Sequence, residues 1–96
     1  MDEEILKSTT IFKALSNATR IEILMLLARN KQLIVQDFVK ELNIAQSTVS
    51  AHLSVLKNAG LIKSEIQATK TIYTLKQKNI EKAEKVMKKC FKQILI

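Results

Sequence analysis

The sequence predicts a mainly α-helical fold with a small β-hairpin, a winged helix-turn-helix in the order helix, helix, helix, helix, strand, strand, helix. Residues 33–60 have the pattern of two short amphipathic helices joined by a tight turn, and a hairpin pattern follows at residues 61–76. The formal net charge of +7 also favours a nucleic-acid partner. At 96 residues, the chain is predicted to be one domain over residues 1–96.

Two helices are expected before the helix-turn-helix. The first covers residues 2–15 and has apolar side chains on one stripe. Asn17 is well placed to cap the second helix, which runs through Arg29. This second helix is apolar nearly all round, and a helix of that kind belongs in the centre of a fold.

The helix-turn-helix is defined by apolar residues at helical spacing. They are Val35, Phe38, Val39 and Leu42 in its first helix and Val49, Leu53 and Leu56 in its second. Asn43 is expected to end the first helix, and the second begins near Gln46. Gly60, the only glycine, supplies the left-handed residue that ends the second helix.

The outer face of the second helix has short side chains where a solvated helix more usually has Glu and Lys. These side chains are Ser47, Ser50, Ala51, Ser54 and Asn58. Short donors and acceptors can approach base edges, and the major groove is wide enough to admit a helix. This face therefore predicts a reader of double-stranded DNA. Ala51 can contact only an apolar group such as a thymine methyl, so we expect an A·T pair opposite it.

The wing is expected at residues 61–76. Residues 61–66 and 71–75 are short and rich in β-branched side chains, as strands of a hairpin are. The turn at residues 67–70 contains no residue that favours positive φ, and related wings usually turn through glycine and contain arginine. We therefore expect its contact with DNA to be slight.

The positive charge is concentrated in the second half of the chain. Residues 1–50 contain six basic and six acidic side chains, whereas residues 51–96 contain ten basic and three acidic ones, an excess of 10 − 3 = 7. Lys57, Lys63 and Lys70 are the candidates for phosphate contacts. The six lysines of the last helix have the pattern of a solvated face: Lys78, Lys82, Lys85, Lys88, Lys89 and Lys92.

The last helix, residues 79–95, has a long apolar stripe. In so small a domain, little core is left for this stripe to pack against. We expect residues 2–15 and 79–95 to pack against the same helices of a second copy. The resulting two-fold symmetric homodimer would bind a palindromic operator, with half-sites about one helical turn apart.

Three stretches of the chain resemble the signature of the ArsR/SmtB repressors: residues 14–21 (ALSNATRI), 46–53 (QSTVSAHL) and 56–62 (LKNAGLI). The resemblance covers residues 5–95. It implies a dimeric winged-helix transcriptional repressor that leaves its operator when an inducer, often a metal ion, binds. It also implies DNA contacts at Gln46, Ser47, Thr48, Ser50 and His52.

The metal ligands of that family are missing here. Many members have Cys-Val-Cys where residues 33–38 read LIVQDF, and the last helix has no histidine and only two carboxylates, Glu81 and Glu84. Zinc, arsenite and cadmium are bound by thiolate or imidazole. We therefore predict no metal site and no cofactor, and the inducer is not predicted.

Two residues have open alternatives. His52 either donates to a phosphate or forms a hydrogen bond within its own motif. Cys90 either packs as a small apolar residue on the last helix or bonds to the Cys90 of a second copy as a thiol-based redox sensor. Because it is the only cysteine, no disulfide can form within one chain.

Other classes of protein fit less well. There is no nucleophile-and-base pair and no glycine-rich phosphate loop, so no enzyme is predicted. The longest apolar run, residues 23–28, is too short for a membrane span, and acidic residues 2–4 replace the basic start of a signal peptide. We expect a cytoplasmic protein. The main alternative is a winged-helix module for protein–protein interaction, which the polar face of residues 46–58 disfavours.

Overall fold

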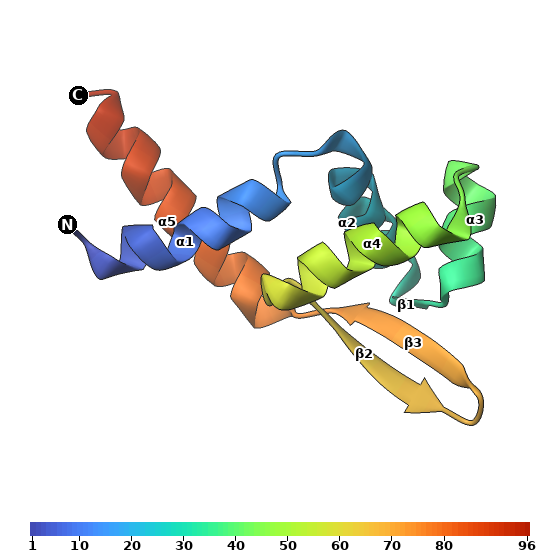
Figure 1. Cartoon of the computed structure of the whole chain (residues 1–96). Coiled ribbons are helices and arrows are strands. Elements are labelled where there is room, and N and C mark those ends of the chain that lie inside the picture. The colour runs from blue at the N-terminus through green and yellow to red at the C-terminus, as the bar shows by residue number, and fades with distance from the viewer.

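The computed structural model describes residues 1–96 and has the predicted winged helix-turn-helix fold. Figure 1 traces its eight elements in chain order. The helices are α1 (Glu3–Ala14), α2 (Ala18–Asn30), α3 (Val35–Leu42), α4 (Gln46–Asn58) and α5 (Gln77–Ile94). The strands are β1 (Gln32–Leu33), β2 (Ile62–Gln67) and β3 (Lys70–Leu75). The last helix begins two residues earlier than predicted.

The sheet has three strands, one more than the predicted hairpin. Its order is β1-β3-β2, and β1 pairs antiparallel with β3 through Gln32 opposite Thr74 and Leu33 opposite Tyr73. Two residues are too few to give an alternating pattern, so β1 is defined only by its distant partner. The wing is therefore anchored at its base to the segment that precedes α3.

The wing turns through two residues, Ala68 and Thr69, between paired Gln67 and Lys70. Ala68 has φ 55, a left-handed conformation. An L-residue adopts it at a cost of roughly 1–2 kcal/mol, because Cβ then approaches the following carbonyl oxygen. Because this turn has no glycine, it forms at the cost of backbone strain at Ala68.

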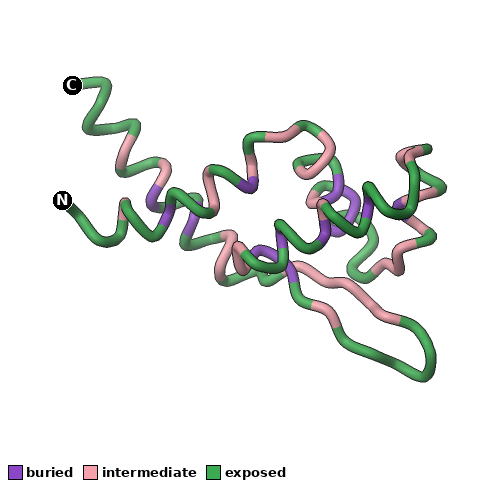
Figure 2. Tube along the Cα trace, in the orientation of Figure 1, coloured by how far each residue is buried: buried purple, intermediate pink, exposed green.

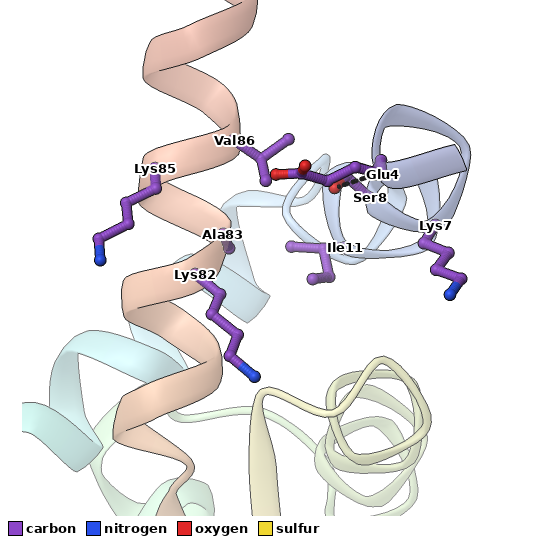
Figure 3. Close-up of a pocket in the computed structure, with 8 residues that line it drawn as sticks. All are labelled: Glu4, Lys7, Ser8, Ile11, Lys82, Ala83, Lys85 and Val86. Carbon is purple, nitrogen blue, oxygen red and sulfur yellow. Dashed lines mark hydrogen bonds between the residues drawn. The ribbon is translucent and has the colours of Figure 1, made fainter. Parts of the chain in front are cut away.

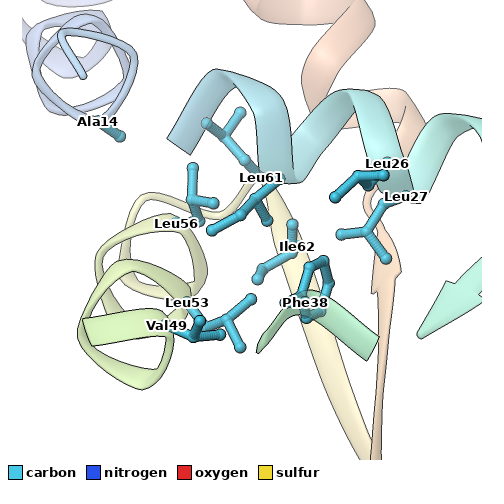
Figure 4. Packing of buried hydrophobic residues seen from close by; sticks show 10 residues of the cluster. Ala14, Leu26, Leu27, Phe38, Val49, Leu53, Leu56, Leu61 and Ile62 are labelled. Carbon is cyan, nitrogen blue, oxygen red and sulfur yellow. The ribbon is translucent and has the colours of Figure 1, made fainter. Parts of the chain in front are cut away.

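The core lies between α2, α3, α4 and the base of the wing (Figure 4). Ten buried side chains form it: Ala14, Ile23, Leu26, Leu27, Phe38, Val49, Leu53, Leu56, Leu61 and Ile62. Phe38 is fully buried and meets Tyr73 edge to face, with ring centroids 6.4 Å apart and an interplanar angle of 76°. This pair fixes α3 against β3.

Helix α2 contributes to the core, but only one of its sides is buried, so its apolar side chains do not place the whole helix in the centre of the fold as expected. Leu26 and Leu27 pack in the core, but Ile21 is 42% exposed and Met25 is 51% exposed. The physical reason is coverage: α2 contacts α4, β1 and β3, and these elements cover one of its faces.

The three predicted helix caps, Asn17, Asn43 and Gly60, are confirmed. Asn17 Oδ1 accepts a hydrogen bond from the Arg20 N–H at 3.1 Å and caps α2. Asn43 has φ 53 and ends α3. Gly60 has φ 77 after α4, with the Leu61 N–H bonded to the Leu56 carbonyl at 3.1 Å. These caps set the turn between α3 and α4 and the entry into β2.

Helices α1 and α5 cross one another at one end of an elongated molecule, whose extents are 48 × 24 × 22 Å (Figure 1). Figure 2 shows their outer ends as exposed, away from the buried centre. On α5 only Ala83 and Val86 are buried, while Phe91 is 56% exposed and Ile94 is 71% exposed. None of the helices combines the length and apolar character that crossing a membrane requires.

Candidate nucleic-acid interface

Helix α4 presents one continuous exposed face because its opposite face is buried. Val49, Leu53 and Leu56 are at most 1% exposed and anchor the helix in the core. The predicted site residues on the rest of the helix are exposed: Gln46, Ser47, Thr48, Ser50, Ala51, Ser54 and Lys57. Thirteen residues span about 20 Å, so this face is long enough to lie along a groove.

The N-terminus of α4 has no side-chain cap. Ala45 precedes the helix, and its carbonyl oxygen accepts the N–H groups of Thr48 and Val49 at 3.1 and 3.0 Å. The first backbone N–H groups of a helix have no intrahelical partner and are partly positive. Because Ala45 has no polar side-chain atom, the N–H groups of Gln46 and Ser47 are free to bind an acceptor such as a phosphate oxygen.

Gln46, the first residue of α4, is joined to the helix before it. Gln36 of α3 donates from Nε2 to Gln46 Oε1 at 3.2 Å, and both side chains are exposed. Sequence reasoning missed Gln36, because a ten-residue separation across a turn has no periodic signature. The structure thus adds an exposed amide beside the start of α4.

His52 lies at the flank of α4 and is half-buried. Its Nδ1 is 3.3 Å from Arg20 Nη1, so its partner belongs to α2 and lies outside residues 33–60. The same guanidinium donates to the carbonyl oxygens of Ala14 at 2.7 Å and Lys13 at 3.2 Å. Arg20, which the sequence did not single out, therefore ties the end of α1 to the middle of α4. A phosphate contact by His52 stays a prediction.

The two wing lysines lie on the strands of the wing, Lys63 on β2 and Lys70 on β3. Strand pairing puts Lys63 beside Thr74 and Lys70 beside Gln67, on the side of the sheet opposite the buried Ile62. Both lysines are exposed. The structure therefore places eight of the ten predicted site residues on α4, seven of them exposed and His52 half-buried, and the other two, Lys63 and Lys70, on the wing.

The charges of the three phosphate candidates are not paired within the chain. The ion pairs are Lys88 with Glu84 at 3.8 Å, and Lys89 with Asp2 at 3.5 Å and with Glu4 at 3.9 Å. All of them lie on α5 or at the start of α1. Lys57, Lys63 and Lys70 therefore keep their charge for an external anion.

Hollows lie on both sides of the crossing of α1 and α5. One, of about 320 Å³, has Ile11, Ala83 and Val86 at its base and lysines at its rim (Figure 3). The other, of about 370 Å³, is lined entirely by apolar or sulfur-containing side chains: Phe12, Leu15, Met87, Cys90, Phe91 and Ile94. Cys90 is half-buried there. No group of three or more His, Cys, Asp and Glu side chains is placed to hold a metal ion.

Comparison with known proteins identifies relatives that are described as regulators of transcription. The family model described as "Bacterial regulatory protein, arsR family" matches residues 17–64. An uncharacterized HTH-type transcriptional regulator of Methanocaldococcus jannaschii is 35% identical over 85 residues, which cover 88% of this chain and 96% of that protein.

Two further comparisons concern solved structures. The transcriptional activator HlyU of Vibrio cholerae is 31% identical over 81 residues, covering 84% of this chain and 74% of that protein. Its structure aligns with a TM-score of 0.72 at 32% identity over 78% of this chain and 80% of that chain. An ArsR-like transcriptional regulator from a Rhodococcus species aligns with a TM-score of 0.83 over 96% of this chain and 86% of that chain. At 22% identity, the latter comparison speaks for the fold alone.

Proposed function

This chain belongs to the bacterial arsR family of transcriptional regulators, and from that premise we propose that it is a sequence-specific repressor that binds double-stranded DNA as a homodimer. In this proposal α4 enters the major groove and its exposed face reads base edges. A two-fold axis between the copies matches a palindromic operator, because each half-site then receives one α4.

The observation that carries the proposal is the exposure of short polar side chains along α4. Ser47, Ser50 and Ser54 are exposed, and each hydroxyl can donate or accept a hydrogen bond. Val55, 39% exposed, is the only large apolar side chain exposed on this helix. Protein interfaces are usually centred on aromatic and aliphatic anchors, so DNA is favoured over a protein partner.

The homodimer is supported by the uncovered apolar side chains of α1 and α5. Phe91 and Ile94 are mostly exposed in the single chain and continue the apolar hollow that contains Cys90. Covering a side chain such as Phe91 is worth roughly 1.5–3 kcal/mol, so a second copy bringing the same stripe is strongly favoured. In this arrangement Cys90 packs as an apolar residue.

The sense of regulation is part of the proposal. The Vibrio relative is named an activator. We propose repression because occupancy of an operator suffices for it, whereas activation also needs a productive contact with the transcription machinery. A reporter assay with the operator overlapping a promoter distinguishes the two, since repression predicts lower expression when the protein is present.

The DNA-binding proposal is tested by selecting bound sequences from random duplex DNA at moderate salt. We expect one enriched, two-fold symmetric sequence. Gln46→Ala and Ser50→Ala should change base preference at defined positions. Lys70→Ala should weaken binding to all sequences alike and reduce the salt slope by about one. Equal losses on operator and random duplex for Gln46→Ala would contradict direct reading by α4.

The dimer is tested by placing a charge in the apolar stripe of α5. Phe91→Glu should convert the dimer to a monomer in analytical ultracentrifugation and lower affinity for the full operator far more than for a half-site. Lys92→Glu is the matched control, because Lys92 is exposed on the opposite side of α5. A wild-type chain that sediments as a monomer at micromolar concentration would refute the proposal.

A further inference from the structure

The hydrogen bond between Gln36 and Gln46 has a consequence for which base is read. We propose that Gln36 is a positioning residue that fixes the donor–acceptor orientation of Gln46, and so sets the base preference at the position that Gln46 reads. This inference rests on the proposed function, since it requires that α4 enters a DNA groove. It assigns a role to a side chain that does not itself have to touch a base.

The placement of the two amides supports this role. Gln36 is the second residue of α3, and Gln46 is the first residue of α4. The first turn of α3 is held firmly, because Asp37 accepts the Ile34 N–H at 2.9 Å and Phe38 is fully buried. Gln36 therefore projects from a fixed backbone toward the start of α4.

The chemistry of the amide group makes the orientation matter. An amide offers an oxygen that accepts and an NH₂ group that donates. Gln36 Nε2 donates to Gln46 Oε1, so the bond engages the acceptor of the Gln46 amide and leaves its NH₂ group available to a ligand. In this orientation the Gln46 amide offers a ligand its two N–H donors. The second lone pair of Oε1 remains for a base that also donates, as adenine does.

Restraint of Gln46 before binding also affects selectivity. A free glutamine rotates its amide and can offer either its oxygen or its nitrogen to a base. The hydrogen bond to Gln36 favours one of these arrangements in the unbound protein, which reduces the ordering cost of that arrangement alone. Loss of this restraint should lower discrimination between bases at the Gln46 position by about three- to tenfold.

Substitutions at Gln36 separate orientation from charge. Gln36→Lys retains a donor toward Gln46 Oε1, so the amide should keep its orientation. Gln36→Glu offers only acceptors, so Gln46 should turn its NH₂ group toward residue 36 and present its oxygen outward. Gln36→Ala removes the partner. Because charge changes act on the phosphate backbone, they shift affinity for all sequences together and leave relative base preference unchanged.

The experiment is selection of bound sequences from random duplex DNA with the full chain and each variant. We expect Gln36→Lys to keep the wild-type preference, Gln36→Ala to weaken it at one base pair of each half-site, and Gln36→Glu to select a different base there. In a Gln46→Ala background, the Gln36 variants should have no further effect on preference. Far-UV circular dichroism melting checks that each variant is folded.

Three outcomes would overturn the inference. If all Gln36 variants select the wild-type sequence, Gln36 does not orient Gln46. If Gln36→Ala changes preference equally in the Gln46→Ala background, Gln36 reads a base by itself. If the Gln36→Lys and Gln36→Glu variants change preference in the same way, the donor–acceptor argument is wrong. A wild-type chain that selects no sequence at all would instead refute the proposed function, and with it this inference.

Discussion

Replacing Arg20 should destabilise the fold although its side chain is only half-buried. Arg20 Nε donates the one hydrogen bond that the Ala14 carbonyl accepts, and Ala14 is 1% exposed. A buried acceptor that loses its donor costs roughly 1–3 kcal/mol. The Lys13 carbonyl keeps the bond from the Ser16 backbone N–H, so it adds little. With the lost contact to His52, Arg20→Met should lower the free energy of unfolding by about 2–3 kcal/mol.

The assay is urea unfolding followed by far-UV circular dichroism, at one protein concentration for all variants. Arg29→Met is the matched control, since it removes the same charge from an exposed position of the same helix. We expect this control to change stability by about 0.5 kcal/mol or less. Arg20→Lys should lower the free energy of unfolding by about 1 kcal/mol, because a single amine can replace only some of the hydrogen bonds that the guanidinium donates.

An Arg20→Met variant as stable as the Arg29→Met control would refute the reasoning. It would mean that water replaces the guanidinium at the Ala14 carbonyl without cost. Hydrogen exchange gives a second check on the Arg20→Met variant. If amide protection falls in α1 but is unchanged in α2 and α4, Arg20 does not link α1 to α4 through His52.

Three other predictions follow from local geometry. Ala68→Gly should raise stability by about 0.5–1 kcal/mol in urea unfolding, because φ 55 suits glycine, whereas Thr69→Gly in the same turn should not stabilise. The Glu4 N–H that donates to Asp2 holds the pKa of that carboxyl below its ordinary 3.8. Its stabilising effect is therefore present above this value and lost as pH falls through the lowered pKa. Asp2→Asn, which still caps α1, should abolish this part of the loss of helicity as pH falls below the ordinary pKa of the carboxyl. Asn79→Ala removes a 2.8 Å bond to the Gly60 carbonyl and should cost about 1 kcal/mol in the same urea assay.

Much of the candidate site follows from local sequence. The spacing of Val49, Leu53 and Leu56 fixed which face of α4 is buried, and therefore that Ser47, Ser50 and Ser54 are exposed. Asn43 and Gly60 ended their helices as predicted, because left-handed φ is a property of one residue and its neighbours. Interactions of this range leave a signature within a few residues of the chain.

The tertiary structure decided what links the elements. Arg20 and His52 lie beside one another although they are 32 residues apart in sequence. Strand β1 exists only because Gln32 and Leu33 pair with β3. The exposure of Ile21 and Met25 on α2 likewise depends on which neighbours cover that helix. The physical reason is that hydrogen bonds and burial between distant segments depend on how helices dock, and docking is not encoded in the period of any single segment.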